Sequence, residues 1–287
     1  MPDPAAPSVC WLVVNPTSGS NTEGCGETLS AAFAARGMSV ERVIAFPDDP
    51  LPDPAALDAA GVGLVAVYTG DGTINALVNH LSGWGGALLV LPGGTMNLLP
   101  LRLHRTTDYE AILDIVAAGG ALARRPVCVR CPAGLALAGL LVGPGTVWNR
   151  VRETLRAGAI AETAKETLAA LRETTSGPGI LLADRRAARD GGYPLVELTP
   201  GEHGVQIDGY YAEAPLDYAG QAWATLRHRF REGPHDRLGL AESVTLVSLD
   251  GSPLPCLIDG EPGECPSGSC FRVEPCGVDL LATAHDI

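Results

Sequence analysis

Two glycine-containing turns carry the residues of this sequence that are best suited to chemistry. The first reads Gly-Asp-Gly-Thr at residues 70–73, directly after an apolar segment and directly before a helical pattern. Glycine permits a tight turn with positive φ and close approach of a ligand, and a helix N-terminus attracts phosphate. We therefore expect Gly70 and Gly72 to bind phosphate, with Thr73 capping the helix or hydrogen-bonding a phosphate oxygen. A carboxylate at Asp71 would be repelled there unless it holds Mg²⁺ or accepts a proton, the alternative being that it only caps the helix.

The second turn reads Gly-Gly-Thr-Met-Asn at residues 93–97 and follows the next apolar segment. In a parallel sheet both turns lie at the carboxyl edge of the strands, where ligands bind in this architecture. The loop at 15–19, Asn-Pro-Thr-Ser-Gly, would form a third wall of the site. Because Lys165 is the only lysine, the sequence argues against a P-loop and against Schiff-base chemistry. Backbone amides and arginines would have to carry the phosphate charge.

Alternating strand and helix patterns in the first half position these turns. This alternation predicts an α/β fold with a doubly wound, mostly parallel sheet. The expected strands are residues 10–15, 39–46, 62–68 and 87–91, and the expected helices are residues 27–37, 55–60, 73–81 and 108–118.

After residue 125 the pattern changes to short strand-like segments between turn clusters, which predicts a second, mainly β domain. These segments include one continuous strand over 135–142, a hairpin turn at Asp208-Gly209, and one long amphipathic helix over 148–173. We expect an α/β domain at 1–125 and a β-rich domain at 126–274.

Composition limits the function classes. The 33 acidic against 20 basic residues give a formal net charge of −13, which argues against nucleic-acid binding. No apolar segment is long enough to cross a bilayer, and the N-terminus lacks the pattern of a signal peptide, so a cytoplasmic protein is expected. The eight cysteines are expected to be free thiols, with zinc binding by Cys128, Cys131, Cys265 and Cys270 as the alternative.

The three loops, together with Asp-Gly-Glu at 259–261, resemble the catalytic-domain family of diacylglycerol kinases, sphingosine and ceramide kinases and their bacterial lipid-kinase relatives. NAD kinases and phosphofructokinases carry turns like Gly-Asp-Gly-Thr, but the other motifs favour lipid kinases. The resemblance spans nearly the whole chain and implies that MgATP binds between two domains. These would be an α/β nucleotide-binding domain at 1–125 and a C-terminal β-sandwich domain at 126–274 that binds the lipid substrate. By the same resemblance, a tail at 275–287 would return to the first domain. It assigns cofactor binding to Asn15, Pro16, Thr17, Ser18, Gly70, Gly72, Thr73, Gly93, Gly94, Thr95 and Asn97.

The resemblance also implies that Asp71 or Glu261 accepts the proton of a lipid hydroxyl. Asp71 stands at a helix N-terminus beside phosphates, which suits it to Mg²⁺, whereas Glu261 follows an apolar strand where the lipid would enter. We therefore expect Glu261 to be the base and Asp71 to organise the metal. The lipid substrate, diacylglycerol-like or sphingoid-like, would be met at the inner membrane surface by peripheral contact.

Two departures from the family pattern bear on activity. Many bacterial members have an acidic residue just after the second turn, where this chain has Leu98, and an aspartate near the position of Cys128. Two carboxylates of the Mg²⁺ network are thus missing. The alternatives to an ATP-dependent lipid kinase are a nucleotide-binding protein without turnover and an NAD kinase-like enzyme, which would leave residues 259–261 unexplained.

Overall fold

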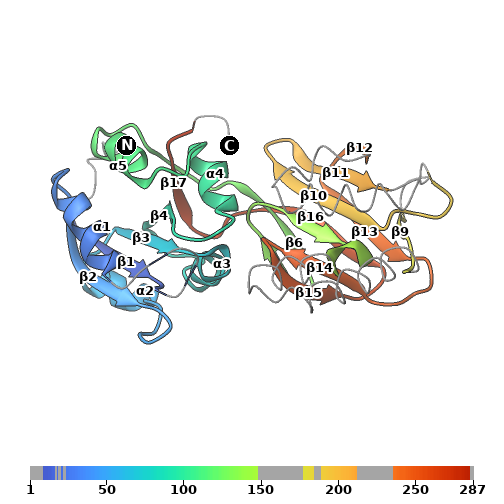
Figure 1. Ribbon diagram of the computed structural model, residues 1–287, viewed down its shortest axis with the longest axis horizontal. Coiled ribbons are helices and arrows are strands. Elements are labelled where there is room, and N and C mark those ends of the chain that lie inside the picture. The colour runs from blue at the N-terminus through green and yellow to red at the C-terminus, as the bar shows by residue number, and fades with distance from the viewer. Residues whose placement is uncertain are drawn as a thin grey trace, which may run out of the picture. The chain divides into compact units, whose positions relative to one another are not determined.

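The computed structural model describes residues 9–16, 18, 21, 24–147, 177–183, 189–211 and 235–284. Thr17 and the helix predicted over 148–173 lie outside the described residues. The chain divides into two compact units, drawn as ribbons in Figure 1. Unit 1 comprises residues 1–128 and 275–287, and unit 2 comprises residues 129–274.

Unit 1 contains a six-stranded sheet in the order β2-β1-β3-β4-β17-β5. All neighbours in this sheet are parallel except β5, which runs antiparallel to β17. Strand β3 is buried on both faces, as its continuous apolar sequence requires of a central parallel strand. The strands are β1 (Val9–Val14), β2 (Ser39–Ala45), β3 (Leu64–Thr69), β4 (Ala87–Pro92), β5 (Leu122–Arg124) and β17 (Asp279–Ala282).

Helices pack on this sheet. Asp53 and Asp108 accept backbone N–H bonds at the starts of α2 and α5, which explains where these two helices begin. Phe33 of α1 and Ile112 of α5 share one buried core with strand residues such as Leu89. The predicted α/β architecture of the first half is confirmed. The helices are α1 (Cys25–Ala34), α2 (Pro54–Ala59), α3 (Asp71–His80), α4 (Leu98–His104) and α5 (Tyr109–Ala117).

Unit 2 contains two sheets, in the orders β12-β11-β10-β8-β14-β15 and β7-β6-β16-β13-β9. Neighbouring strands pair antiparallel, for example β10 with β11 and β13 with β16. The elements are β6 (Val127–Cys131), β7 (Gly134–Ala136), β8 (Leu140–Val142), η1 (Pro144–Val147), β9 (Ile180–Leu182), β10 (Leu195–Gly201), β11 (Gly204–Tyr210), β12 (His235–Ala241), β13 (Ser243–Ser248), β14 (Leu254–Ile258), β15 (Glu261–Cys265) and β16 (Ser269–Pro275).

Both sheets of unit 2 contribute to a single core. One buried cluster contains Phe271 and Leu246 from one sheet and Val142 and Ile207 from the other, and all four side chains are fully buried. This arrangement, two antiparallel sheets around a shared core, is the predicted β-sandwich.

Two sequence predictions for unit 2 are wrong. Asp208 and Gly209 lie within β11, paired with β10, and form no turn. Glycine is needed at 209 because a Cβ there would lie 2.6 Å from the ring of Tyr193. The strand predicted over 135–142 is divided into β7 and β8, which belong to different sheets.

Candidate active site

The two glycine turns of unit 1 pack against each other, backbone to backbone. A Cβ on Gly93 would lie 2.5 Å from the carbonyl carbon of Tyr68, and a Cβ on Gly94 would lie 2.7 Å from the Cα of Gly70. A Cβ on Gly70 would in turn lie 2.7 Å from Oγ of Ser18. Three loops, which follow β1, β3 and β4, therefore meet at one edge of the sheet.

Gly70, Gly93 and Gly94 are required for close approach and not for an unusual backbone conformation. Gly70 has φ −76° and ψ 163°, and Gly72 is the second residue of α3. Gly70, Gly72, Gly93 and Gly94 are all absent from the residues with positive φ. The predicted positive φ is thus wrong, because the backbone turns directly from an extended residue into a right-handed helix.

Helix α3 begins two residues earlier than predicted. Gly70 is its N-cap and offers no side chain to the first turn, which consists of Asp71, Gly72 and Thr73. The first backbone bond of the helix runs from the N–H of Ile74 to the carbonyl of Gly70, 3.1 Å. Thr73 lies inside the first turn and therefore does not cap the helix. The N–H groups of Asp71, Gly72 and Thr73 come before the first hydrogen bond between turns of the helix.

Asp71 connects the two turns. Its Oδ1 accepts the N–H of Leu99, 3.3 Å away, in the first turn of α4. Helix α4 was not predicted. Its N-cap residue, Asn97, makes no side-chain hydrogen bond to the helix, so the carboxylate of Asp71, in helix α3, caps α4 instead. Leu98, at the position of the absent family carboxylate, is the first residue of this helix.

Asn97 closes the second turn through its side chain. Its Oδ1 accepts the N–H of Gly94 at 2.8 Å, and its Nδ2 donates to the carbonyl of Gly94 at 3.0 Å. The N–H of Gly93 donates to the carbonyl of Leu91 at 3.0 Å. The amides of Gly93 and Gly94 are thus engaged within the loop, and Thr95 is the exposed residue at its tip.

The first loop is closed by a residue that the sequence analysis missed. Nδ2 of Asn21 donates to the carbonyl of Asn15 at 2.9 Å and to that of Tyr68 at 3.5 Å. The N–H of Ser18 donates to the carbonyl of Asn15 at 3.2 Å, forming a turn over Pro16. Asn21 therefore ties this loop to the end of β3, a contact that no local pattern reveals.

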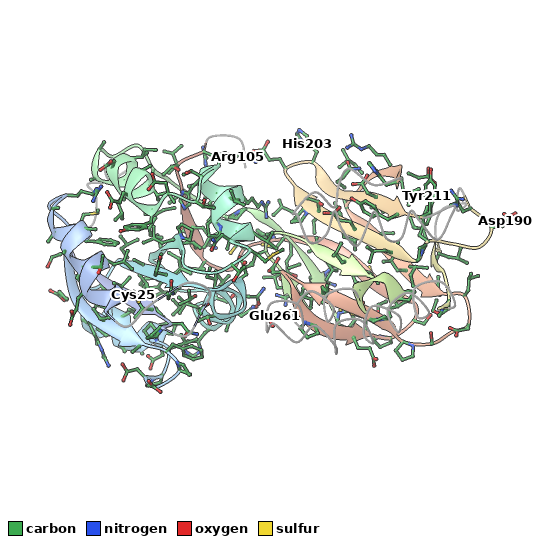
Figure 2. All side chains as sticks on the ribbon, viewed as in Figure 1. Cys25, Arg105, Asp190, His203, Tyr211 and Glu261 are labelled. Carbon is green, nitrogen blue, oxygen red and sulfur yellow. The ribbon has the colours of Figure 1, made fainter. Side chains whose placement is uncertain are left out.

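Glu261 belongs to unit 2, where Figure 2 labels it. It is exposed, begins β15, and pairs with Ile258 at the end of β14. Asp259 and Gly260 between them have φ of 50° and 92°, so they form a two-residue turn with positive φ at both positions. Asp71 therefore begins a helix of unit 1, and Glu261 follows a tight turn of unit 2.

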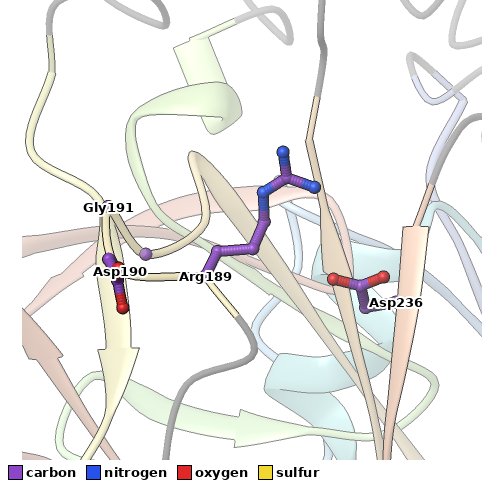
Figure 3. Close-up of a pocket in the computed structure, with 5 residues that line it drawn as sticks. Arg189, Asp190, Gly191 and Asp236 are labelled. Carbon is purple, nitrogen blue, oxygen red and sulfur yellow. The ribbon is translucent and has the colours of Figure 1, made fainter.

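Unit 2 also has an open pocket, drawn in Figure 3, which no predicted site residue lines. It is lined by Arg189, Asp190, Gly191, Gly192 and Asp236. Oδ2 of Asp236 accepts the hydroxyl of Tyr193 at 2.8 Å, and the guanidinium of Arg189 lies 3.8 Å from the ring centre of Tyr211. Asp236 and Arg189 each contact a neighbouring tyrosine, and no lining residue belongs to the candidate site.

The cysteines are free thiols and do not form the zinc site considered above. Cys128 and Cys131 are three residues apart on one strand, so their side chains face opposite sides. Cys128 instead hydrogen-bonds Cys276, and this contact lowers the pKa of Cys276 to about 7. Among the described residues, no three His, Cys, Asp or Glu side chains are grouped to hold a metal ion.

Mg²⁺ nevertheless suits the donor available at the turns. Magnesium is bound in many phosphate-transferring sites by one or two carboxylates, with the remaining ligands from water and from substrate phosphates. Asp71, half-buried beside the first turn of α3, is one such carboxylate. The first turn of α3 lacks a side-chain cap, which suits it to the phosphates of a nucleotide.

Comparison with known proteins shows what unit 1 is similar to. Residues 9–126 match the sequence model of the diacylglycerol kinase catalytic domain. This segment is therefore similar to that family. The resemblance predicted from the motifs is therefore confirmed, and the Asp-Gly-Glu turn at 259–261 lies beyond the matched residues. A search of curated protein sequences gave no match.

Solved structures show the same fold along almost the whole chain. A diacylglycerol kinase from Bacillus anthracis strain Sterne superposes with a TM-score of 0.59 at 13% identity, covering 98% of each chain. Two candidate diacylglycerol kinases from that strain give TM-scores of 0.58 and 0.57 at 14% and 15% identity. They cover 96% and 95% of this chain and 97% and 96% of their own. No helix in the described ranges combines the length and apolar character needed to span a membrane.

Proposed function

We propose that this protein is an ATP- and Mg²⁺-dependent lipid kinase that transfers the γ-phosphoryl group to a lipid hydroxyl. The observation that carries the proposal is the meeting of three loops at the uncapped N-terminus of α3, in a segment that matches the diacylglycerol kinase catalytic domain. The β- and γ-phosphates would lie against residues 70–73, and residues 93–97 would hold that turn in shape.

Two carboxylates of this chain would have separate roles in the reaction. Asp71 holds Mg²⁺, which neutralises charge on the transferred phosphoryl group when it is bound. Glu261 accepts the proton of the lipid hydroxyl as the oxygen attacks the γ-phosphorus and the bond to the β-phosphate oxygen breaks. The rest of the rate enhancement comes from positioning, as is general for phosphoryl transfer.

Glu261→Gln is the first test. We expect it to keep MgATP affinity within a few-fold and to lower lipid phosphorylation by about two orders of magnitude, because a positioned base contributes roughly 10²- to 10⁴-fold. Phosphate transfer from labelled ATP to diacylglycerol and sphingoid lipids in mixed micelles measures this. Glu264→Gln, an exposed glutamate on the same strand, is the matched control and should retain activity.

Asp71→Asn separates the metal role from the base role. This variant should require more Mg²⁺ for half-maximal activity, whereas Glu261→Gln should not. If Asp71→Asn lowers activity by about two orders of magnitude with an unchanged Mg²⁺ requirement while Glu261→Gln is fully active, the two roles are reversed.

A nucleotide-binding protein without turnover is the second candidate. Cys128 is a buried thiol and Leu98 begins α4, so neither supplies the carboxylate found in many bacterial relatives. Binding of MgATP without phosphate transfer to any lipid in the panel would favour this candidate over the kinase.

A further inference from the structure

Asp259 has more hydrogen bonds than a turn residue needs. Its Oδ2 accepts the N–H of Leu137 at 2.8 Å, and its Oδ1 accepts those of Ala138 at 2.8 Å and Gly139 at 3.0 Å. Its own N–H donates to the carbonyl of Gly139 at 3.0 Å. The side chain is buried, with 4% of the residue exposed.

These bonds explain why the segment predicted as one strand is divided in two. Residues 137–139 give their N–H groups to a carboxylate about 120 positions later in the chain, and so leave the β ladder. The segment joins β7 of one sheet to β8 of the other. The turn between β14 and β15 is thereby fixed to the point where the chain passes between the two sheets.

Asp259 is poorly placed to take a proton itself. A general base needs an oxygen within hydrogen-bond reach of the substrate hydroxyl. Both oxygens of Asp259 already accept backbone N–H groups inside unit 2, whereas Glu261, two residues later, is exposed. The two carboxylates of this motif therefore have different environments.

We propose that Asp259 is the positioning residue of the catalytic turn, holding the hairpin that presents Glu261, and that it is not the proton acceptor. This inference rests on the proposed kinase function for its kinetic consequence. The backbone conformation of the turn agrees with this role, because Asp tolerates the φ of 50° at residue 259. Gly260 has a φ of 92°, and a Cβ there would meet no atom within 4 Å. Glycine is therefore needed at 260 for the backbone conformation and not for lack of space.

Asp259→Asn and Asp259→Ala test the proposal in the full chain. Asn retains one acceptor oxygen but places an NH₂ group against an N–H donor, whereas Ala removes all three bonds. We expect kcat for phosphate transfer to fall about 10-fold in Asp259→Asn and about 100-fold in Asp259→Ala, with the KM for MgATP unchanged within about two-fold. Asp208→Asn is the control, a buried carboxylate of unit 2 on β11.

The pH profile distinguishes positioning from proton transfer. The acidic limb of kcat/KM should persist in Asp259→Asn and disappear in Glu261→Gln. Loss of the limb in Asp259→Asn would identify Asp259 as the base and overturn the proposal. Wild-type kcat in both Asp259 variants would also overturn it.

Amide hydrogen exchange tests the anchor without any need for activity. In Asp259→Asn the amides of residues 137–139 should exchange faster than in Asp208→Asn, and Glu261→Gln should leave them unchanged. Unchanged exchange in both Asp259 variants would overturn the anchor. If the wild type phosphorylates no lipid, the kinase function fails and exchange alone decides whether Asp259 holds the turn.

Discussion

At the scale of single residues, polar side chains around the candidate site act mainly on the backbone. Asp71 caps a second helix, Asn97 closes its own loop, and Asp259 holds a distant segment. The sequence predicted that Asp71 and Asn97 belong to one site, but it could not predict these partners. Leu99 lies 28 positions from Asp71, so only the folded chain brings the two together.

His104 provides a pH-dependent prediction at the same scale. Its Nδ1 lies 3.0 Å from the hydroxyl of Thr283 and its Nε2 lies 3.0 Å from the carbonyl of Val90, which joins α4 to β4 and to the segment after β17. Burial lowers its pKa to about 4, so the folded protein keeps the ring neutral. Below pH 6.5 the unfolded chain binds a proton that the folded chain does not. Stability from this group is therefore complete above pH 6.5 and is lost as the pH falls towards 4.

The size of this loss is roughly 3 kcal/mol, since one pKa unit corresponds to about 1.4 kcal/mol. Urea denaturation between pH 4 and 7 measures it as the slope of unfolding free energy with pH. His104→Gln should have a smaller slope in this range, and His80→Gln, an exposed histidine of α3, should match the wild type. Equal slopes in wild type and His104→Gln would contradict the prediction.

At the scale of elements, patterns that depend on near neighbours were predicted well. The apolar segments of β1, β3 and β4 and the helices α1, α3 and α5 were found, because period and capping are local properties. Helix α4 was missed because it is short, contains Pro100, and takes its cap from Asp71 of another helix. The sequence did not predict β17 as a strand, because it has only four residues and its partner β4 lies before all of unit 2 in the sequence.

Gly94→Ala tests the packing of the two turns. The added Cβ would lie 2.7 Å from the Cα of Gly70, so we expect a loss of about 1–3 kcal/mol in unfolding free energy and at least a 10-fold weaker affinity for MgATP. Gly85→Ala is the matched control, because a Cβ there meets nothing within 4 Å. Calorimetry and urea denaturation measure both effects. Wild-type affinity in a folded Gly94→Ala protein would exclude this turn from the nucleotide site.

At the scale of the whole molecule, unit 1 is built from two separate parts of the chain. Leu280 of β17 is fully buried, pairing with Leu88 on one side and Arg124 on the other. Leu280→Ala should therefore cost about 2–5 kcal/mol of unfolding free energy, measured by urea denaturation. Leu249→Ala, at a residue 49% exposed, should change stability by less than about 0.5 kcal/mol. Comparable losses in the two variants would show that β17 is not part of the stable sheet.

The discontinuous sheet also affects how the protein is made. Domains of nascent chains generally fold from the N-terminus as they leave the ribosome. Unit 1 cannot complete its sheet in this way, because β17 stands between β4 and β5 and is translated only after all of unit 2. Until then β4 and β5 lack their common neighbour and expose unpaired backbone groups. We expect unit 2 to reach its native fold first on the ribosome and the candidate nucleotide site of unit 1 to mature last.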